Sequence, residues 1–191
     1  MSDVIVPKNA RPVDSSFGAP LEPIGNPLTA GIGPGSWAER ADRPDVTVKG
    51  AARIVPMRVA TDFFVAHEDP DPRGLNVIGM DDGVAGKVVD LWVDRSEPCL
   101  RYLEIELTGG GRRLVPLPFT RIPRQKGFLP FISTDTSAPH VKVHVLKATD
   151  FAGIPQTRSA DLVTLLEEDK ISAYFGAGSM YNSNLRFGPL V

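Results

Sequence analysis

Alternating apolar and polar residues predict a β domain between about residues 52 and 147. The segment LRYLEIELT (100–108) shows the alternation best, with one set of side chains predicted inward and the other outward: Leu103, Ile105 and Leu107 against Tyr102, Glu104 and Glu106. Further strands are predicted in ARIVPMRV (52–59), DFFVAHE (62–68), GLNVIGM (74–80), VAGKVVDLWVD (84–94), RRLVPLPF (112–119) and HVKVHVLK (140–147). Short strands separated by tight turns predict a small antiparallel barrel or sandwich.

The pattern changes on both sides of this domain. Residues 7–45 are rich in proline and glycine, and their apolar residues follow neither the helical nor the strand period. This is compatible with a disordered tail or with an extended arm lying on a surface. The apolar residues suited to anchor such an arm are Leu21, Ile24, Leu28, Ile32 and Trp37. We therefore predict an arm at 1–48, a β-barrel at 49–150 and a C-terminal segment with a short helix at 151–191.

The C-terminal helix has a recognisable start. Thr164 and Glu167 have the spacing of a capping box, and Glu168 follows in the first turn, where the helix dipole favours negative charge. Gly176 and Gly178 each cost about 1 kcal/mol inside a helix. The helix is thus expected to be short, or to pack closely against another segment at these glycines.

Composition narrows the possible partners. The formal net charge of −2 over 191 residues gives no general attraction to nucleic acid, so no nucleic-acid partner is expected. A single cysteine excludes an internal disulfide. No stretch approaches the roughly 20 apolar residues of a membrane helix, so we expect the chain to be soluble or held at a membrane by other chains.

Asp94, Glu97 and Arg101 form the most informative polar group. Two carboxylates beside an arginine can hold a proton with a tuned affinity. The same pattern describes a solvated turn with a surface ion pair worth about 0–1 kcal/mol, and spacing alone favours that interpretation. His140 and His144 lie about 13 Å apart on a strand, too far to share one zinc ion, so no metal site is predicted. Nothing forms a nucleophile–base set, and an enzymatic role is not expected.

Several long segments resemble the H subunit of photosynthetic reaction centres. They run in order along the chain: GIGPGSWAER (31–40), RIVPMRVATDF (53–63), AGKVVDLWVDRSE (85–97), RYLEIEL (101–107), FAGIP (151–155) and VTLLEEDKISAYFGAGSMY (163–181). The resemblance implies a PRC-type β-barrel in a subunit without pigments, located at the cytoplasmic face of the bacterial inner membrane. Its implied partners are the L and M subunits, and light-harvesting subunits are further candidates. Bacteriochlorophyll, bacteriopheophytin, quinone and non-haem iron are then expected in the partners, with no cofactor bound by this chain alone.

The resemblance also implies roles for particular residues. Asp94, Glu97, Arg101 and Glu168 match members of a charged network that helps deliver protons to the secondary quinone. The family's membrane helix has no counterpart here, so we expect a separate transmembrane polypeptide, or a truncated or processed form. Thr47, Lys49 and Ala51 replace the histidines and the acid that some members carry at a proton-uptake point. The alternative class is a free-standing PRC-barrel module in RNA processing or ribosome maturation.

Overall fold

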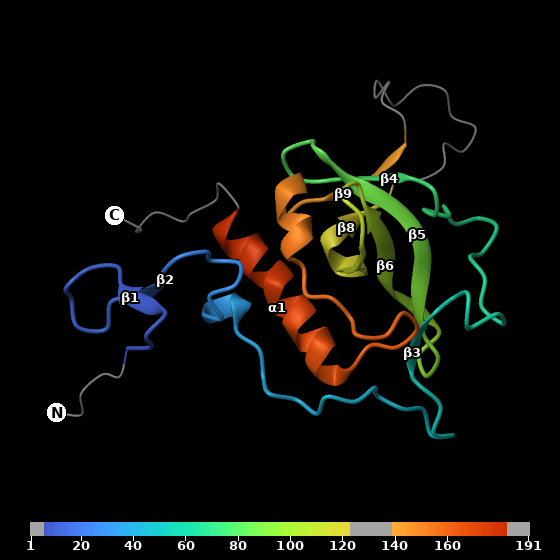
Figure 1. Ribbon diagram of the computed structural model, residues 1–191, viewed down its shortest axis with the longest axis horizontal. Helices are drawn as coiled ribbons and strands as arrows, with labels where there is room; N and C mark the ends of the chain where they lie inside the picture. The colour runs from blue at the N-terminus through green and yellow to red at the C-terminus, as the bar shows by residue number, and fades with distance from the viewer. Residues whose placement is uncertain (1–5, 123–138, 183–191) are drawn as a thin grey trace.

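A seven-stranded sheet forms the centre of the protein, whose computed structural model describes residues 6–122 and 139–182 (Figure 1). The strands are β3 (Ile54–Pro56), β4 (Asn76–Ile78), β5 (Val84–Asp94), β6 (Cys99–Leu107), β7 (Arg112–Pro116), β8 (Thr120–Arg121) and β9 (His140–Val143). Their order is β7-β6-β5-β4-β9-β8, with β3 paired to β5. The predicted mainly β class with one C-terminal helix is confirmed. Two details differ: β4 and β9 pair in parallel, and the sheet does not close into a ring within the described residues.

The long strands β5 and β6 bury apolar side chains as the alternation predicts. Leu103 and Ile105 are fully buried and Leu107 is 8% exposed, so the predicted inward set is confirmed. The side chains on the opposite face of β6 do not form the expected solvent-exposed set. Tyr102 and Glu104 are also buried, and only Glu106 is exposed. The second face of β6 is therefore covered too, and its polar groups need partners inside the protein.

Five predicted strands are wrong or too long, and two of them, 52–59 and 74–80, shorten to β3 and β4. Residues 62–68 form turns and irregular backbone, with Phe64 84% exposed, because no neighbouring strand pairs with their backbone groups. The strand from residue 112 ends at Pro116 and continues as the 3₁₀ turn η2 (Leu117–Phe119), since proline offers no donor to a ladder. The strand from residue 140 ends at Val143. Residues 123–138 of the predicted barrel lie outside the described residues.

The C-terminal helix α1 (Leu165–Tyr181) is longer than predicted, at 17 residues. Its start is as expected: Thr164 and Glu167 exchange the two hydrogen bonds of a capping box. Its glycines lie at close contacts, because a Cβ at Gly176 would stand 2.6 Å from Pro34 O and one at Gly178 would stand 2.5 Å from Val145 O. Of the two expectations, a short helix or close packing at the glycines, the structure confirms the close packing.

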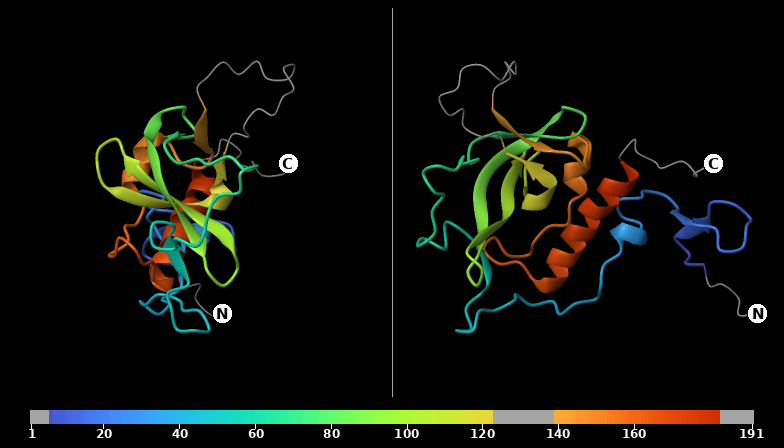
Figure 2. Two further views of the ribbon diagram at one scale, coloured as in Figure 1. Left: turned by 90° about the vertical axis from the view of Figure 1, so that its right-hand side faces the viewer. Right: turned by 180° about the vertical axis from the view of Figure 1, so that it is seen from behind.

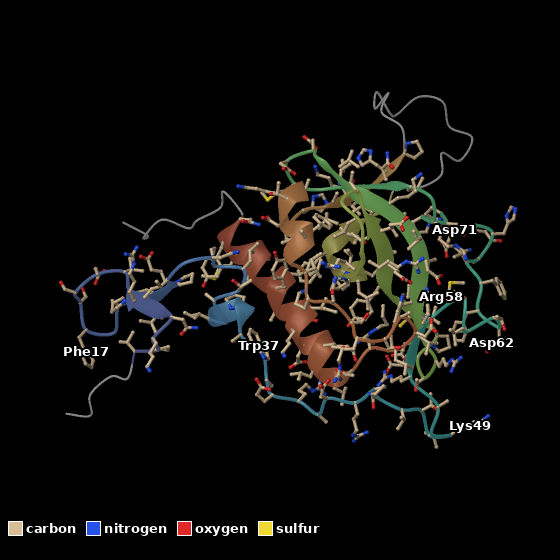
Figure 3. The ribbon with its side chains drawn as sticks, viewed as in Figure 1. Phe17, Trp37, Lys49, Arg58, Asp62 and Asp71 are labelled. Atoms are coloured by element: carbon tan, nitrogen blue, oxygen red, sulfur yellow. The ribbon has the colours of Figure 1, made fainter. Side chains whose placement is uncertain are left out.

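The N-terminal arm contacts α1 on the side away from the sheet and then continues past the start of α1 to β3 (Figure 2). It contains the hairpin β1 (Ala10–Pro12) and β2 (Leu21–Pro23), and the 3₁₀ turn η1 (Gly33–Gly35), which packs on α1. Among the predicted anchors Leu28 is buried, Ile32 is half-buried, and Leu21, Ile24 and Trp37 are exposed. Figure 3 shows Trp37 beside α1, where Lys170 Nζ lies 5.9 Å from its ring.

A further 3₁₀ helix, η3 (Ala148–Gly153), connects β9 to the loop before α1. Within the described ranges, no helix combines the length and the apolar character needed to cross a bilayer. The domain boundaries at residues 48 and 150 stay a prediction.

Candidate functional site

Asp94 ends β5 as a fully buried carboxylate that is paired with Arg53. The pairing of β3 with the end of β5 brings the two residues together. Arg53 Nε lies 2.9 Å from both carboxylate oxygens, and its Nη2 lies 2.8 Å from Oδ2. The amides of Ser96 and Glu97 also donate to Asp94 Oδ1. Burial alone would raise the pKa of Asp94, but the hydrogen bonds from Arg53 and the two amides outweigh it and hold the pKa below its ordinary value.

Arg53 also gathers two further carboxylates at the surface. Glu97 Oε1 lies 3.4 Å from Arg53 Nη2, and Asp45 Oδ2 lies 3.4 Å from Arg53 Nη1. The Glu97 side chain is 72% exposed, so this contact is the weak surface type of ion pair. Asp94 and Glu97 are therefore grouped as the sequence suggests, but through Arg53. Arg101 forms no ion pair with either of them in the part of the chain that the structure describes.

Glu168 and Tyr102 form the second half of the site. Tyr102 on β6 donates a hydrogen bond of 2.8 Å from its hydroxyl to Glu168 Oε2 in the first turn of α1. Burial raises the pKa of Glu168 above its ordinary value, although the Tyr102 hydrogen bond and the charges of Arg101 and Arg40 oppose the shift. The pKa of the Tyr102 hydroxyl is raised by burial and by the neighbouring Glu168 charge.

The two halves meet in one cleft of about 240 Å³. Its lining comes from the arm, β3, β6 and α1: Arg40, Asp45, Arg53, Ile54, Arg101, Tyr102, Leu165, Glu168, Asp169 and Ser172. Asp169 fixes the arm to this wall by accepting hydrogen bonds of 3.3 Å from the amide of Ala38 and from Arg40 Nη1. The N-terminal arm is thus part of the site.

Sequence reasoning located the acids but missed the groups that tune them. Arg53 is 41 residues from Asp94, and nothing local indicates that their strands pair. Alternation predicts Tyr102 on the outward face, but the residue packs in the core and bonds to Glu168 of α1, a contact that the local pattern does not contain. One signal was present, because Arg53 is a charged residue directly before the short apolar strand β3 (Ile54–Pro56).

The arrangement offers two kinds of acid for two tasks. Asp94 has a lowered pKa and stays ionised near neutral pH, so it supplies a fixed negative charge. Glu168 has a raised pKa and a hydroxyl neighbour, which suits a group that takes up and releases a proton. Among the described residues, no three His, Cys, Asp or Glu side chains are grouped to hold a metal ion.

Comparison with known protein families gives two matches that do not overlap. Residues 4–59 match the family described as the photosynthetic reaction centre, H-chain N-terminal region. Residues 64–137 match the PRC-barrel domain, and residues 123–137 of that match lie outside the described part of the structure. The H-chain family associates with the core subunits of reaction centres at the membrane and indicates a structural, non-enzymatic subunit. Together the two matches support an H-subunit-like protein that contains a PRC-barrel domain.

Proposed function

We propose that the chain is the non-pigmented H-type subunit of a type-II reaction centre, peripheral to the cytoplasmic face of the inner membrane. It stabilises the L and M core from that side and assists proton delivery to the secondary quinone. Bacteriochlorophyll, bacteriopheophytin, quinone and non-haem iron belong to the partner subunits in this proposal. The H-chain match at residues 4–59 supports it over the RNA-processing alternative, because that match covers the arm rather than the barrel alone.

The partner-facing side is proposed to be the one that carries the loop before β3. This loop is held by a backbone bridge between Val46 and Ala52, and it leaves Val46 48% exposed and Val48 fully exposed. Phe64, at 84% exposure, adds a large apolar side chain in the segment after β3. Exposed apolar side chains beside Arg53 and its acids fit a contact that excludes water from their surroundings.

Glu168 is proposed as the group that holds the proton. The observation that carries this assignment is its position in the cleft: half-buried, with a raised pKa, and bonded to the Tyr102 hydroxyl. Asp94 is assigned a different task, because an acid with a lowered pKa carries charge rather than protons at neutral pH. Its pairing with Arg53 fixes the electrostatic field of the cleft. Exposed Glu97 joins this network to the surface through Arg53, and the charge of Arg101 tunes Glu168.

Purification from native cells tests the assembly. A tagged chain is recovered under mild detergent, and the absorption spectrum of the eluate is recorded. Co-purifying bacteriochlorophyll supports the proposal, whereas co-purifying ribosomal particles without pigment would support RNA processing instead.

Two matched variants then test the contact surface. Val48→Asp places a charge on the proposed contact and is expected to reduce pigment recovery, because a charge buried there has no partner. Val84→Asp is the control, since Val84 is 54% exposed and lies at the opposite end of β5 from Asp94, about 30 Å away. Equal recovery with both variants would place the contact elsewhere.

A further inference from the structure

A second cleft, of about 250 Å³, opens between β7 and the loop at 156–160. It shares no lining residue with the cleft around Glu168. Three arginines line it, Arg112 and Arg113 from β7 and Arg158 from the loop, together with the hydroxyl residues Thr157 and Ser159.

Arg113 carries a positive charge that no carboxylate in the described part of the chain offsets. Its Nη1 and Nη2 donate to the backbone oxygens of Arg112 and Ala152, at 2.8 and 3.0 Å. The side-chain oxygen of Gln156, in the orientation that satisfies both groups, accepts from the same two nitrogens at 2.6 and 3.1 Å. The Nε atom of Arg113 is buried without a hydrogen-bond partner. Burial lowers the pKa of the Arg113 guanidinium, as expected for a partly desolvated cation that lacks an anion.

The two other arginines of the cleft, Arg112 and Arg158, keep hydrogen-bond donors exposed at its mouth. Glu104 is the acid in the lining, and its two oxygens already accept from Arg58, Arg112 and Trp92. Arg112 is 53% exposed, so part of its guanidinium faces solvent beyond this contact. Arg158 is 67% exposed and pairs with Asp42 and Glu167 on the side of α1.

We propose that this cleft binds a small oxyanion with the chemistry of a phosphate group. Arg113 supplies the charge that is not offset, and Arg112 and Arg158 supply exposed donors whose planar forks match oxyanion geometry. The cleft is smaller than the roughly 300–1,000 Å³ typical of organic ligand pockets, which suits an ion or a lipid headgroup. The site is independent of the role proposed for Glu168.

Calorimetric titration of the full chain with inorganic phosphate at constant ionic strength tests the site. Saturable binding is expected, and Arg113→Gln is expected to weaken it about tenfold or more, because a charged donor is replaced by a neutral one. Arg73→Gln is the control, since Arg73 pairs with Asp71 outside both clefts. Absence of saturable binding, or equal weakening by both variants, would overturn the proposal.

A second pair of variants, at Ser159, tests the site independently of any unfolding caused by Arg113→Gln. Ser159 Oγ accepts a hydrogen bond of 3.2 Å from the Asp161 amide, and a carboxylate or an amide oxygen can replace it there. Ser159→Asp is expected to abolish phosphate binding by adding a competing anion, while Ser159→Asn retains it. Equal binding by these two folded variants would contradict the site.

A vesicle experiment distinguishes the two possible sources of the phosphate group, a lipid headgroup and a free ion. Sedimentation of the chain with phosphatidylcholine vesicles that contain phosphatidic acid is compared with phosphatidylcholine vesicles alone. Binding to the acidic vesicles that requires Arg113 assigns the site to a lipid headgroup, and binding only of inorganic phosphate assigns it to a free ion. Binding of neither probe contradicts the proposal.

Discussion

The hydroxyl of Tyr102 donates a hydrogen bond of 2.8 Å to Glu168 and so joins the central sheet to the first turn of α1. Tyr102 is 4% exposed, and the pair lies in a cleft that also contains Arg53 and Arg101. A hydrogen bond to an ionised carboxylate favours the ionised form, so Tyr102 limits how far burial can raise the pKa of Glu168. Burial thus sets the direction of the Glu168 pKa shift, and this contact, with the charges of Arg101 and Arg40, limits its size.

Tyr102→Phe is predicted to raise the pKa of the Glu168 carboxyl further, because burial remains and the opposing hydrogen bond is lost. A ¹³C NMR titration of the labelled carboxyl measures the shift. Tyr174→Phe is the matched control: it removes another buried hydroxyl, bonded to Asp150 O, and leaves Glu168 untouched. A Glu168 pKa that is the same in Tyr102→Phe and in the wild type would show that the hydrogen bond does not tune the acid.

Stability is predicted to depend on pH with opposite signs at Asp94 and Glu168. The lowered pKa of Asp94 contributes stability above the unfolded value of about 3.9, and this is lost as the pH falls through the folded value. The raised pKa of Glu168 contributes stability below the unfolded value of about 4.3, and this is lost as the pH rises through the folded value.

Urea unfolding at neutral pH measures both effects. Asp94→Asn is expected to lower the free energy of unfolding by about 3 kcal/mol, because Arg53 loses its buried counter-charge. Glu168→Gln is expected to leave the free energy of unfolding unchanged or to raise it. Destabilisation of similar size by both variants would refute the different tasks assigned to the two acids.

Local patterns predicted the two long strands β5 and β6 and the helix start, whereas the site depends on contacts between distant segments. Alternation placed Leu103 and Ile105 in the core, and the spacing of Thr164 and Glu167 located the start of α1. The pairing of Arg53 with Asp94 depends on a long-range strand pair, and periodicity carries no information about it. The parallel pairing of β4 with β9 joins segments more than 60 residues apart and was missed for the same reason.

Gly176→Ala is predicted to destabilise the protein by about 1–3 kcal/mol, although alanine is the better helix former. A Cβ at this position would lie 2.6 Å from Pro34 O, so the arm and α1 would have to move apart. Thermal unfolding measures the stability, and limited proteolysis of the arm measures its release. Ser179→Ala, at an exposed position of α1, serves as the control and is expected to be neutral or slightly stabilising. Unchanged arm protection in Gly176→Ala would mean that the contact does not hold the arm.

Weak inhibition by zinc is predicted for the assembled complex. The loop before β3 carries Thr47, Lys49 and Ala51, which are poor ligands for zinc, and Figure 3 shows Lys49 at the outer end of this loop. We therefore expect protons to enter through a different opening. The check is a zinc titration of the second electron transfer after a flash. Strong slowing by micromolar zinc, abolished by mutation of a residue in this chain, would show that the uptake point lies here.

Flash kinetics of the assembled reaction centre test the proton-delivery claim most directly. Glu168→Gln removes the titrating group and keeps an acceptor for Tyr102. The second, proton-coupled electron transfer to the secondary quinone is predicted to slow, and the first to change much less. Glu97→Gln and Asp94→Asn are predicted to act in the same direction and non-additively, because both residues contact Arg53. Ser172→Ala, a neutral change in the cleft lining, is the control. Wild-type rates in Glu168→Gln, Glu97→Gln and Asp94→Asn from about pH 6 to about pH 9 would contradict the account.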